Sequence, residues 1–242
     1  MIIRYFQKGF NYSQDGPGNR LVYHLQGCNL RCPWCSNPEG MDAAHPAKEE
    51  EASAVAQFVL SAKPMFFEGG GLTLTGGECT VQLRAVEELL RLVRAGGVNT
   101  CIETNATSPA LAELLPLVDH LIADLKHPDP REHARWTGAS NETIRGNIAA
   151  AARSGKPVWM RIPLIHGVND SDEALTGFLQ FLRPLAGLEN FQVEILRYHE
   201  YGKDKWKQIG AEYTMRDAFV TPERAEQFER AIRETGVRTI RT

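Results

Sequence analysis

The sequence lacks the features that mark membrane proteins and nucleic-acid-binding proteins. None of its apolar runs comes close to the roughly 20 residues that a transmembrane helix needs. A formal net charge of −3 leaves no excess of basic residues for nucleic acid or an anionic membrane surface. The first ten residues, MIIRYFQKGF, lack the apolar core of a signal peptide. We therefore expect a cytoplasmic protein without a membrane or nucleic-acid partner. A length of 242 residues suits one large domain or two small ones, and we expect one domain over residues 1–242.

Cysteine is also scarce, with five residues in the whole chain. In the reducing cytoplasm, so few thiols favour metal or redox chemistry over disulfides. Three of the five lie within eight residues, where Cys28, Cys32 and Cys35 follow the spacing CxxxCxxC. This cluster is the feature of the sequence that a function must explain.

Short apolar runs alternate with helical stretches along the chain. Runs bounded by Gly, Pro or Asn predict buried strands at 20–26, 71–75, 99–104, 119–124, 158–163 and 191–197. Helical spacing of apolar residues predicts helices at 49–62, 81–95, 141–154, 171–183 and 222–235. This alternation implies an α/β fold with parallel strands and right-handed crossovers. Six strands over this length predict an incomplete (β/α)6 TIM-like barrel, with a short edge strand at 237–241.

Polar and unusual residues follow the predicted strands. The cysteine cluster follows the first strand. The other polar or unusual residues lie at or just after the ends of the later strands, at 76–78, 103–105, 124–126, Arg161 and 198–199. In (β/α) barrels, the carboxyl ends of the strands form the active-site face. We therefore expect six loops to converge on one rim.

The spacing of the three clustered cysteines suits a 4Fe–4S cluster. Three thiolates from one short loop leave the fourth iron open to a small molecule, whereas a fully ligated cluster only moves electrons. The alternative is a zinc-stabilised binding module without catalysis. Structural zinc sites commonly use paired CxxC units and four ligands, and only Cys79 is a candidate for the fourth. Iron–sulfur is therefore favoured over zinc.

CxxxCxxC with an aromatic residue before the last cysteine resembles the signature of the radical S-adenosylmethionine (SAM) superfamily. The segments DGPG at 15–18 and LQGCNLRC at 25–32 narrow this resemblance to the glycyl-radical-enzyme activases. The motifs LTGGE, DLK, RIPLI and YH follow in the order of that family. No cysteine-rich ferredoxin-like sequence follows Cys35, so we expect a single cluster.

This resemblance implies the reaction and its partners. The enzyme would cleave SAM to methionine and a 5′-deoxyadenosyl radical, which abstracts a hydrogen atom from a backbone glycine of a partner glycyl radical enzyme. A flavodoxin or ferredoxin would supply the electron, and we expect a monomer. The alternative within the superfamily is an enzyme that acts on a small molecule or a peptide.

The resemblance also implies roles for individual residues. Cys28, Cys32 and Cys35 would hold the cluster. Trp34 would pack against the adenine, and His199 would contact the adenosyl group. The full set implied in cofactor binding is Trp34, Ser36, Gly76, Gly77, Glu78, Glu103, Asp124, Lys126, Arg161 and His199.

The other residues of this set match, in charge or in hydrogen bonding, the groups of SAM that the resemblance implies they contact. The segment 76–78 would bring backbone groups and a carboxylate to the ammonium group of SAM, since glycines allow a close approach. Lys126 and Arg161 would neutralise its carboxylate. Glu103 and Asp124 would bind the ribose hydroxyls or a cation.

Some residues lie outside this pattern or depart from it. Asp15, in the loop before the first strand, is expected on the substrate side. Ser36 stands where the family often has His, and Cys79 where Pro or Ala is usual. We expect Cys79 to be buried, and Cys101 to be buried within its strand.

Overall fold

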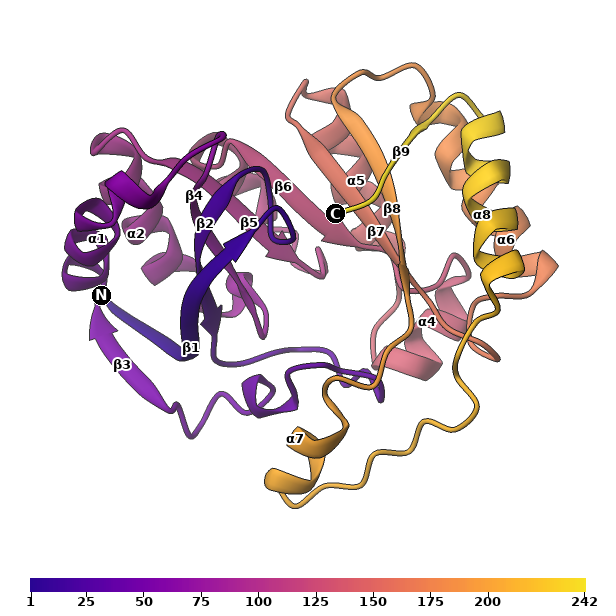
Figure 1. Ribbon diagram of the computed structural model, residues 1–242, viewed down its shortest axis with the longest axis horizontal. Helices are drawn as coiled ribbons and strands as arrows, with labels where there is room; N and C mark the ends of the chain where they lie inside the picture. Colours follow the sequence, from indigo (N-terminus) through magenta and orange to yellow (C-terminus); the bar gives the residue numbers. More distant parts are fainter. The chain divides into compact units, whose positions relative to one another are not determined.

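The computed structural model describes residues 1–242 as a mixed α/β chain (Figure 1). Its strands are β1 (Ile2–Tyr12), β2 (Asn19–Leu25), β3 (Lys48–Glu51), β4 (Gly71–Gly76), β5 (Asn99–Thr104), β6 (His120–Asp124), β7 (Val158–Leu164), β8 (Phe191–Arg197) and β9 (Arg238–Ile240). Its helices are α1 (Ala52–Ser61), α2 (Leu83–Ala95), α3 (Leu111–Leu114), α4 (Pro130–Thr137), α5 (Glu142–Arg153), α6 (Asp172–Leu182), α7 (Lys203–Gln208) and α8 (Pro222–Glu234). None of the helices combines the length and the apolar character that crossing a membrane requires.

The chain divides into two compact units, which are described separately. Unit 1 comprises Met1–Asn29, Asn37–Thr104 and Ala110–Ile122. Unit 2 comprises Leu30–Ser36, Asn105–Pro109 and Ala123–Thr242.

The predicted strands are confirmed, because β2 and β4–β9 lie at the seven predicted positions with bounds that agree within one residue. Parallel pairing joins β2 to β4, β4 to β5, β7 to β8 and β8 to β9. The predicted helices are likewise present as α1, α2, α5, α6 and α8. The mostly parallel sheet follows from the alternation of strands and helices.

The predicted start of the first helix is wrong. Lys48–Glu51 form β3, which is antiparallel to β1, and α1 begins only at Ala52. The register pairs Arg4 with Glu49, and their charged groups lie 2.7 Å apart. Opposite charges that face each other across two strands stabilise the pairing. This long-range contact overrides the helical spacing of the local sequence.

β1 also lies outside the sequence-based prediction. It pairs antiparallel with both β2 and β3. Only Ile3 and Tyr5 among its residues are buried, so β1 lacks the continuous apolar run by which the other strands are recognised.

In unit 1 the strand order is β3-β1-β2-β4-β5, and α1 and α2 lie together on one side of these strands (Figure 1). Side chains alternate between the two faces of a strand. One face presents the buried apolar residues Leu21, Leu72 and Leu74. The opposite face carries Arg20 and Thr73, and is therefore polar.

Arg20 organises this polar face. Its side chain is fully buried, and Nε donates a hydrogen bond to Oγ1 of Thr73 at 2.6 Å. The terminal nitrogens donate to Oδ1 of Asn99 at 3.1 Å and to three backbone carbonyls, including that of Pro17 in the loop before β2. A buried guanidinium needs such a complete set of acceptors. Arg20 therefore fixes the loop to the strands.

The loop before β2 lies against the same polar face. Oγ1 of Thr73 donates to the backbone carbonyl of Asp15 at 2.7 Å. A Cβ on Gly16 would stand 2.9 Å from Cδ of Arg20 and 3.3 Å from Sγ of Cys101, and Gly16 has a φ of +119°. Glycine is thus required at position 16 both for space and for backbone conformation.

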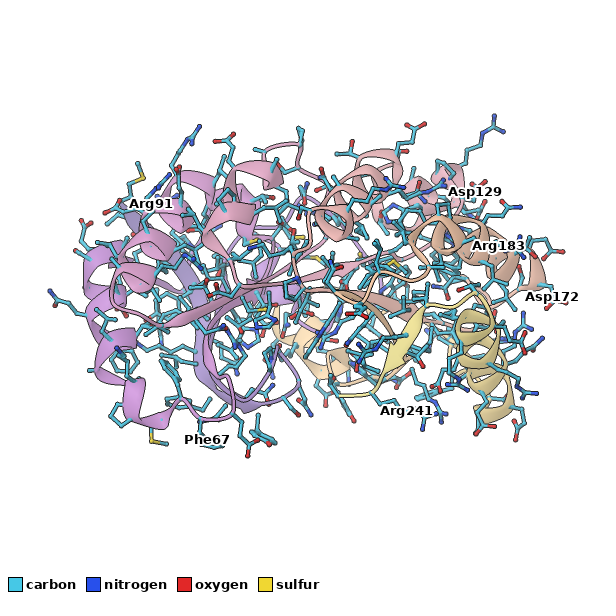
Figure 2. All side chains as sticks on the ribbon, turned by 90° about the horizontal axis from the view of Figure 1, so that it is seen from above. Phe67, Arg91, Asp129, Asp172, Arg183 and Arg241 are labelled. Atoms are coloured by element: carbon cyan, nitrogen blue, oxygen red, sulfur yellow. The ribbon has the colours of Figure 1, made fainter.

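In unit 2 the strand order is β7-β8-β9, with α5 on β7 and α8 on β8 and β9. Oγ1 of Thr221 accepts a hydrogen bond from the backbone N–H of Arg224 at 3.2 Å, so Thr221 caps the N-terminus of α8. Figure 2 shows Asp172 at the start of α6 and Arg183 just beyond its end. Each charge lies at the end of the helix where the helix dipole stabilises it.

Replacing Arg20 by Lys should destabilise unit 1, because an ammonium group cannot supply the forked set of donors. We expect the free energy of unfolding to fall by about 2–4 kcal/mol, since several buried acceptors lose their partner. Denaturant titration of the iron-free protein measures this change. Arg238→Lys, at an exposed position of β9, is the matched control; an equal loss of stability in both variants would contradict the role of Arg20.

Candidate functional site

The ends of β4 and β5 bring two predicted site segments together in unit 1. Oγ1 of Thr75 donates to Oε2 of Glu103 at 2.8 Å. His24 of β2 pairs in register with Thr75. The carboxyl ends of the three parallel strands therefore lie at one edge, as expected for an active-site face.

The predicted glycine pair is a place of close backbone packing. Gly76 has a φ of +104°, and a Cβ on it would stand 2.5 Å from the backbone nitrogen of Leu25. A Cβ on Gly77 would stand 2.2 Å from the carbonyl oxygen of Gly27. Both positions therefore need glycine so that the end of β4 can pack on the backbone of residues 25–27, which lead into Cys28. This need is separate from any contact with a cofactor.

Glu78 is fully buried among hydroxyl groups. Its Oε1 accepts hydrogen bonds from the backbone N–H of Thr80 at 3.0 Å and from Oγ1 of Thr80 and of Thr104, both at 2.7 Å. Glu78 thereby caps the 3₁₀ turn Cys79–Gln82. The carboxylate thus has a local structural role that sequence motifs alone do not reveal.

Cys79 and Cys101 are both fully buried, which confirms their predicted placement. The thiol of Cys79 donates to Oε1 of Glu78 at 3.5 Å. Burial raises the pKa of the Cys79 thiol well above its usual value. A buried, protonated thiol that already donates a hydrogen bond is poorly suited to be a fourth metal ligand.

The cysteine loop begins in unit 1 at Cys28. Nε2 of Gln26 donates at 2.7 Å to two backbone carbonyls, those of Glu39 and Asp42. The backbone N–H of Cys28 donates to the carbonyl of Met41 at 3.3 Å. These bonds fix the start of the loop along the turn at 38–42.

The rest of the loop turns tightly in unit 2. The backbone N–H of Cys35 donates to the carbonyl of Cys32 at 3.1 Å. Trp34 is buried, and its ring centroid lies 6.1 Å from that of Trp136 on α4. Cys32 is buried and Cys35 is half-buried, and none of the five cysteines forms a disulfide. Three thiols on one loop, spaced as CxxxCxxC, supply the type of donor that an iron–sulfur cluster takes.

α4 supports this part of the loop. The backbone N–H of Arg31 donates to the carbonyl of Thr137 at 2.8 Å. His133, one turn earlier, is fully buried, and its Nδ1–H donates to the carbonyl of Ala139 at 2.6 Å. Burial lowers the pKa of His133 to about 4, so the imidazole is neutral at pH 7. Neither α4 nor His133 belongs to the sequence-based prediction.

Asp124 and Lys126 form an ion pair at the end of β6. Nδ2 of Asn169 donates at 2.7 Å to the backbone carbonyls of both Lys126 and Pro163. Its Oδ1 accepts from the backbone N–H of Ile165 at 2.8 Å. The buried Asn169 thus joins the segment after β6 to the end of β7, and brings two predicted site segments together.

Arg161 lies on β7 and forms a buried ion pair. Its Nε donates to Oε2 of Glu194 on β8 at 2.8 Å, and the two residues are paired in register. The charge of Arg161 is therefore already balanced within the protein. Glu194 is absent from the predicted site, although a carboxylate inside the apolar strand FQVEILR is a visible signal of a buried partner.

His199 lies just beyond β8. Its ring stacks on Tyr201 at a centroid distance of 4.2 Å, and burial lowers its pKa. The neighbouring Tyr198 shares a 2.7 Å hydrogen bond with the hydroxyl of Tyr213. Tyr213 lies in an irregular segment, where no periodic pattern indicates its contact with the site.

The family model of the radical SAM superfamily matches residues 22–179. The chain therefore belongs to the radical SAM superfamily, and the predicted family is confirmed. This class of enzyme is incompatible with the alternative of a zinc-stabilised module without catalysis.

Curated relatives indicate the type of radical SAM enzyme to which the chain is similar. The chain is 36% identical over 210 residues to the pyruvate formate-lyase-activating enzyme of Staphylococcus epidermidis, with 83% of each chain covered. It is 34% identical over 212 residues to the enzyme of the same name from Staphylococcus aureus, with 84% of each covered. Within the superfamily, the chain is an activase of this type, which uses a 4Fe–4S cluster and SAM.

Solved structures agree on the fold. A domain of a pyruvate-formate lyase-activating enzyme from Bacteroides vulgatus matches with a TM-score of 0.57 and 25% identity, over 71% of this chain and 98% of that one. A radical SAM methyltransferase from Sphaerobacter thermophilus matches with a TM-score of 0.65 and 18% identity, over 99% and 76%. These neighbours have the partial TIM-barrel fold, so the predicted fold class is confirmed.

The neutral His133 should make stability depend on pH. Between about pH 6.5 and pH 4 the unfolded chain binds a proton at His133 that the folded chain does not, so the free energy of unfolding falls as the pH falls. From pH 7 to pH 5 we expect His133 to contribute a loss of about 2 kcal/mol, and His133→Gln should remove this contribution. Denaturant titration of the iron-free protein at both values tests this.

His45→Gln, at an exposed position, is the control and should keep the pH dependence of the wild type. If the free energy of unfolding depends on pH in the same way in His133→Gln and in the wild type, His133 has the same pKa in the folded and unfolded chains, and the prediction is wrong.

Proposed function

We propose that this enzyme generates a glycyl radical in a pyruvate formate-lyase or a closely similar partner. Identity of 34–36% to activating enzymes over more than four-fifths of the chain carries this proposal. When bound, the cluster supplies the electron that cleaves SAM to methionine and a 5′-deoxyadenosyl radical. The residues of this chain bind and orient the cofactors and admit the partner's glycine.

We assign the cluster ligands to Cys28, Cys32 and Cys35. Their spacing, the absence of disulfides and the backbone bonds that fix both ends of the loop support this assignment. The buried Cys79 and Cys101 take no part in it.

We assign SAM to the residues at the strand ends. The segment 76–78 and Glu103 of unit 1, together with Trp34, Ser36, Asp124, Lys126, Arg161 and His199 of unit 2, are the proposed contacts. Lys126 is the strongest candidate for the cofactor's carboxylate, because its partner Asp124 is partly exposed and can turn to the ribose hydroxyls when the carboxylate binds. Arg161 is a further proposed contact of SAM, and its own charge is balanced by Glu194.

Asp15 is the proposed contact on the side of the partner. Its backbone is held on the polar face of unit 1 by Thr73, and its side chain accepts a hydrogen bond from Asn11. We further propose that residues 1–242 act as one domain, as a cytoplasmic monomer that receives its electron from a flavodoxin or ferredoxin.

Mixing the reduced enzyme, SAM and a pyruvate formate-lyase under anaerobic conditions should produce a doublet electron paramagnetic resonance signal in the partner. One 5′-deoxyadenosine should form for each radical. Cys32→Ala should abolish both products, and Cys101→Ala, a substitution outside the loop, should retain them. Multiple-turnover consumption of a small molecule, without a protein radical, would favour the alternative substrate class.

Replacing Asp124, Lys126 or His199 by Ala should weaken SAM binding while the spectrum of the cluster stays unchanged. Loss of a charge-assisted hydrogen bond should lower the affinity roughly ten- to a hundredfold. Anaerobic calorimetry with the reconstituted enzyme measures it. Lys48→Ala, on the exposed edge strand β3, is the control; wild-type affinity in all three variants would mean that SAM binds elsewhere.

A further inference from the structure

The short helix α7, at the bottom of Figure 1, packs on the end of the cysteine loop. Nε1 of Trp206 donates a hydrogen bond to the backbone carbonyl of Cys35 at 2.9 Å. The two residues are 171 positions apart in the chain. The contact is therefore made by the fold of unit 2 and not by local sequence.

Gly202, just before α7, gives the helix room to approach the loop. A Cβ at this position would stand 2.5 Å from the carbonyl oxygen of Cys35 and 2.7 Å from Cα of Ser36. Its backbone dihedrals, φ −83° and ψ −12°, are open to any residue. Glycine is thus needed here for contact with the loop and not for conformation.

Trp206 is itself anchored to the sheet by aromatic contacts. Its ring lies edge-on to Tyr213 at a centroid distance of 6.0 Å. The hydroxyl of Tyr213 shares a 2.7 Å hydrogen bond with that of Tyr198, directly after β8. Phe219 packs on Tyr198 at 5.0 Å. A continuous set of contacts therefore runs from the end of β8 to the backbone of Cys35.

The geometry points to Trp206 and Gly202 as positioning residues that fix the backbone of Cys35, and with it the direction of the thiol, before the cluster is inserted. The inference rests on the proposed role of Cys35 as a cluster ligand. An indole N–H is a donor only, so its bond to the carbonyl holds one orientation. Ligands held in place in advance lose less freedom when a metal cluster binds.

The first test is made on the reduced, iron-free protein, with iodoacetamide labelling of each cysteine followed by mass spectrometry. Trp206→Phe keeps an aromatic ring and removes the donor. We expect the labelling rate of Cys35 relative to Cys28 to rise about two- to tenfold, as for the loss of one hydrogen bond. Gly202→Ala should raise the same ratio, because its Cβ displaces the Cys35 carbonyl while Trp206 stays intact.

The controls are Trp159→Phe on β7 and Gly146→Ala on α5, where a Cβ meets no atom within 4 Å. Both should keep the wild-type ratio.

Two outcomes overturn the inference. One is wild-type labelling rates at both Cys35 and Cys28 in both variants, and the other is an equal rise at both cysteines, which leaves their ratio unchanged and reports a loosened fold. Because labelling is measured without iron, these outcomes are distinct from a failure of the wild-type protein to bind a cluster, which would contradict the proposed function instead.

Discussion

Buried charged side chains on the polar faces of the parallel strands require hydrogen-bond or ion-pair partners, and the rest of the structure depends on this requirement. In each unit one face of the strands is apolar, and the other carries a buried guanidinium. Arg20 of unit 1 meets this need with neutral acceptors, including Thr73 and the carbonyl of Pro17. Arg161 of unit 2 meets it with the carboxylate of Glu194. Removing water from these charges is costly, so their partners fix the register of the strands and the loops beside them.

The loops at the strand ends face a related constraint, because their backbone groups have no ladder partners. Side chains supply the missing bonds: Gln26 does so for the turn at 38–42, Asn169 for the segment after β6, and Trp206 for Cys35. A side-chain amide or indole bonds in a defined direction, unlike a purely apolar contact. Loops that carry the predicted cofactor residues are therefore held in place without regular secondary structure.

The sequence predicts the parallel strands well, because each is a short apolar run between breakers. It fails at β1 and β3, where pairing between Arg4 and Glu49 depends on residues 45 positions apart. The three cysteines are recognisable from spacing alone, since one loop carries them. His133 and Trp206 are not, because their contacts arise only after folding, and Glu194 is marked only as a carboxylate inside an apolar strand.

Burial separates the two kinds of residue within the predicted site. Glu78 and Arg161 are buried and bonded to protein groups, so their substitution disturbs the fold as well as any cofactor contact. Glu103, Asp124 and His199 remain partly exposed, and a ligand can reach them without unfolding the strand ends. The sequence motifs assign both groups of residues to the predicted site without distinguishing them. Accessibility therefore separates residues that a ligand can reach from residues that maintain the shape of the strand ends.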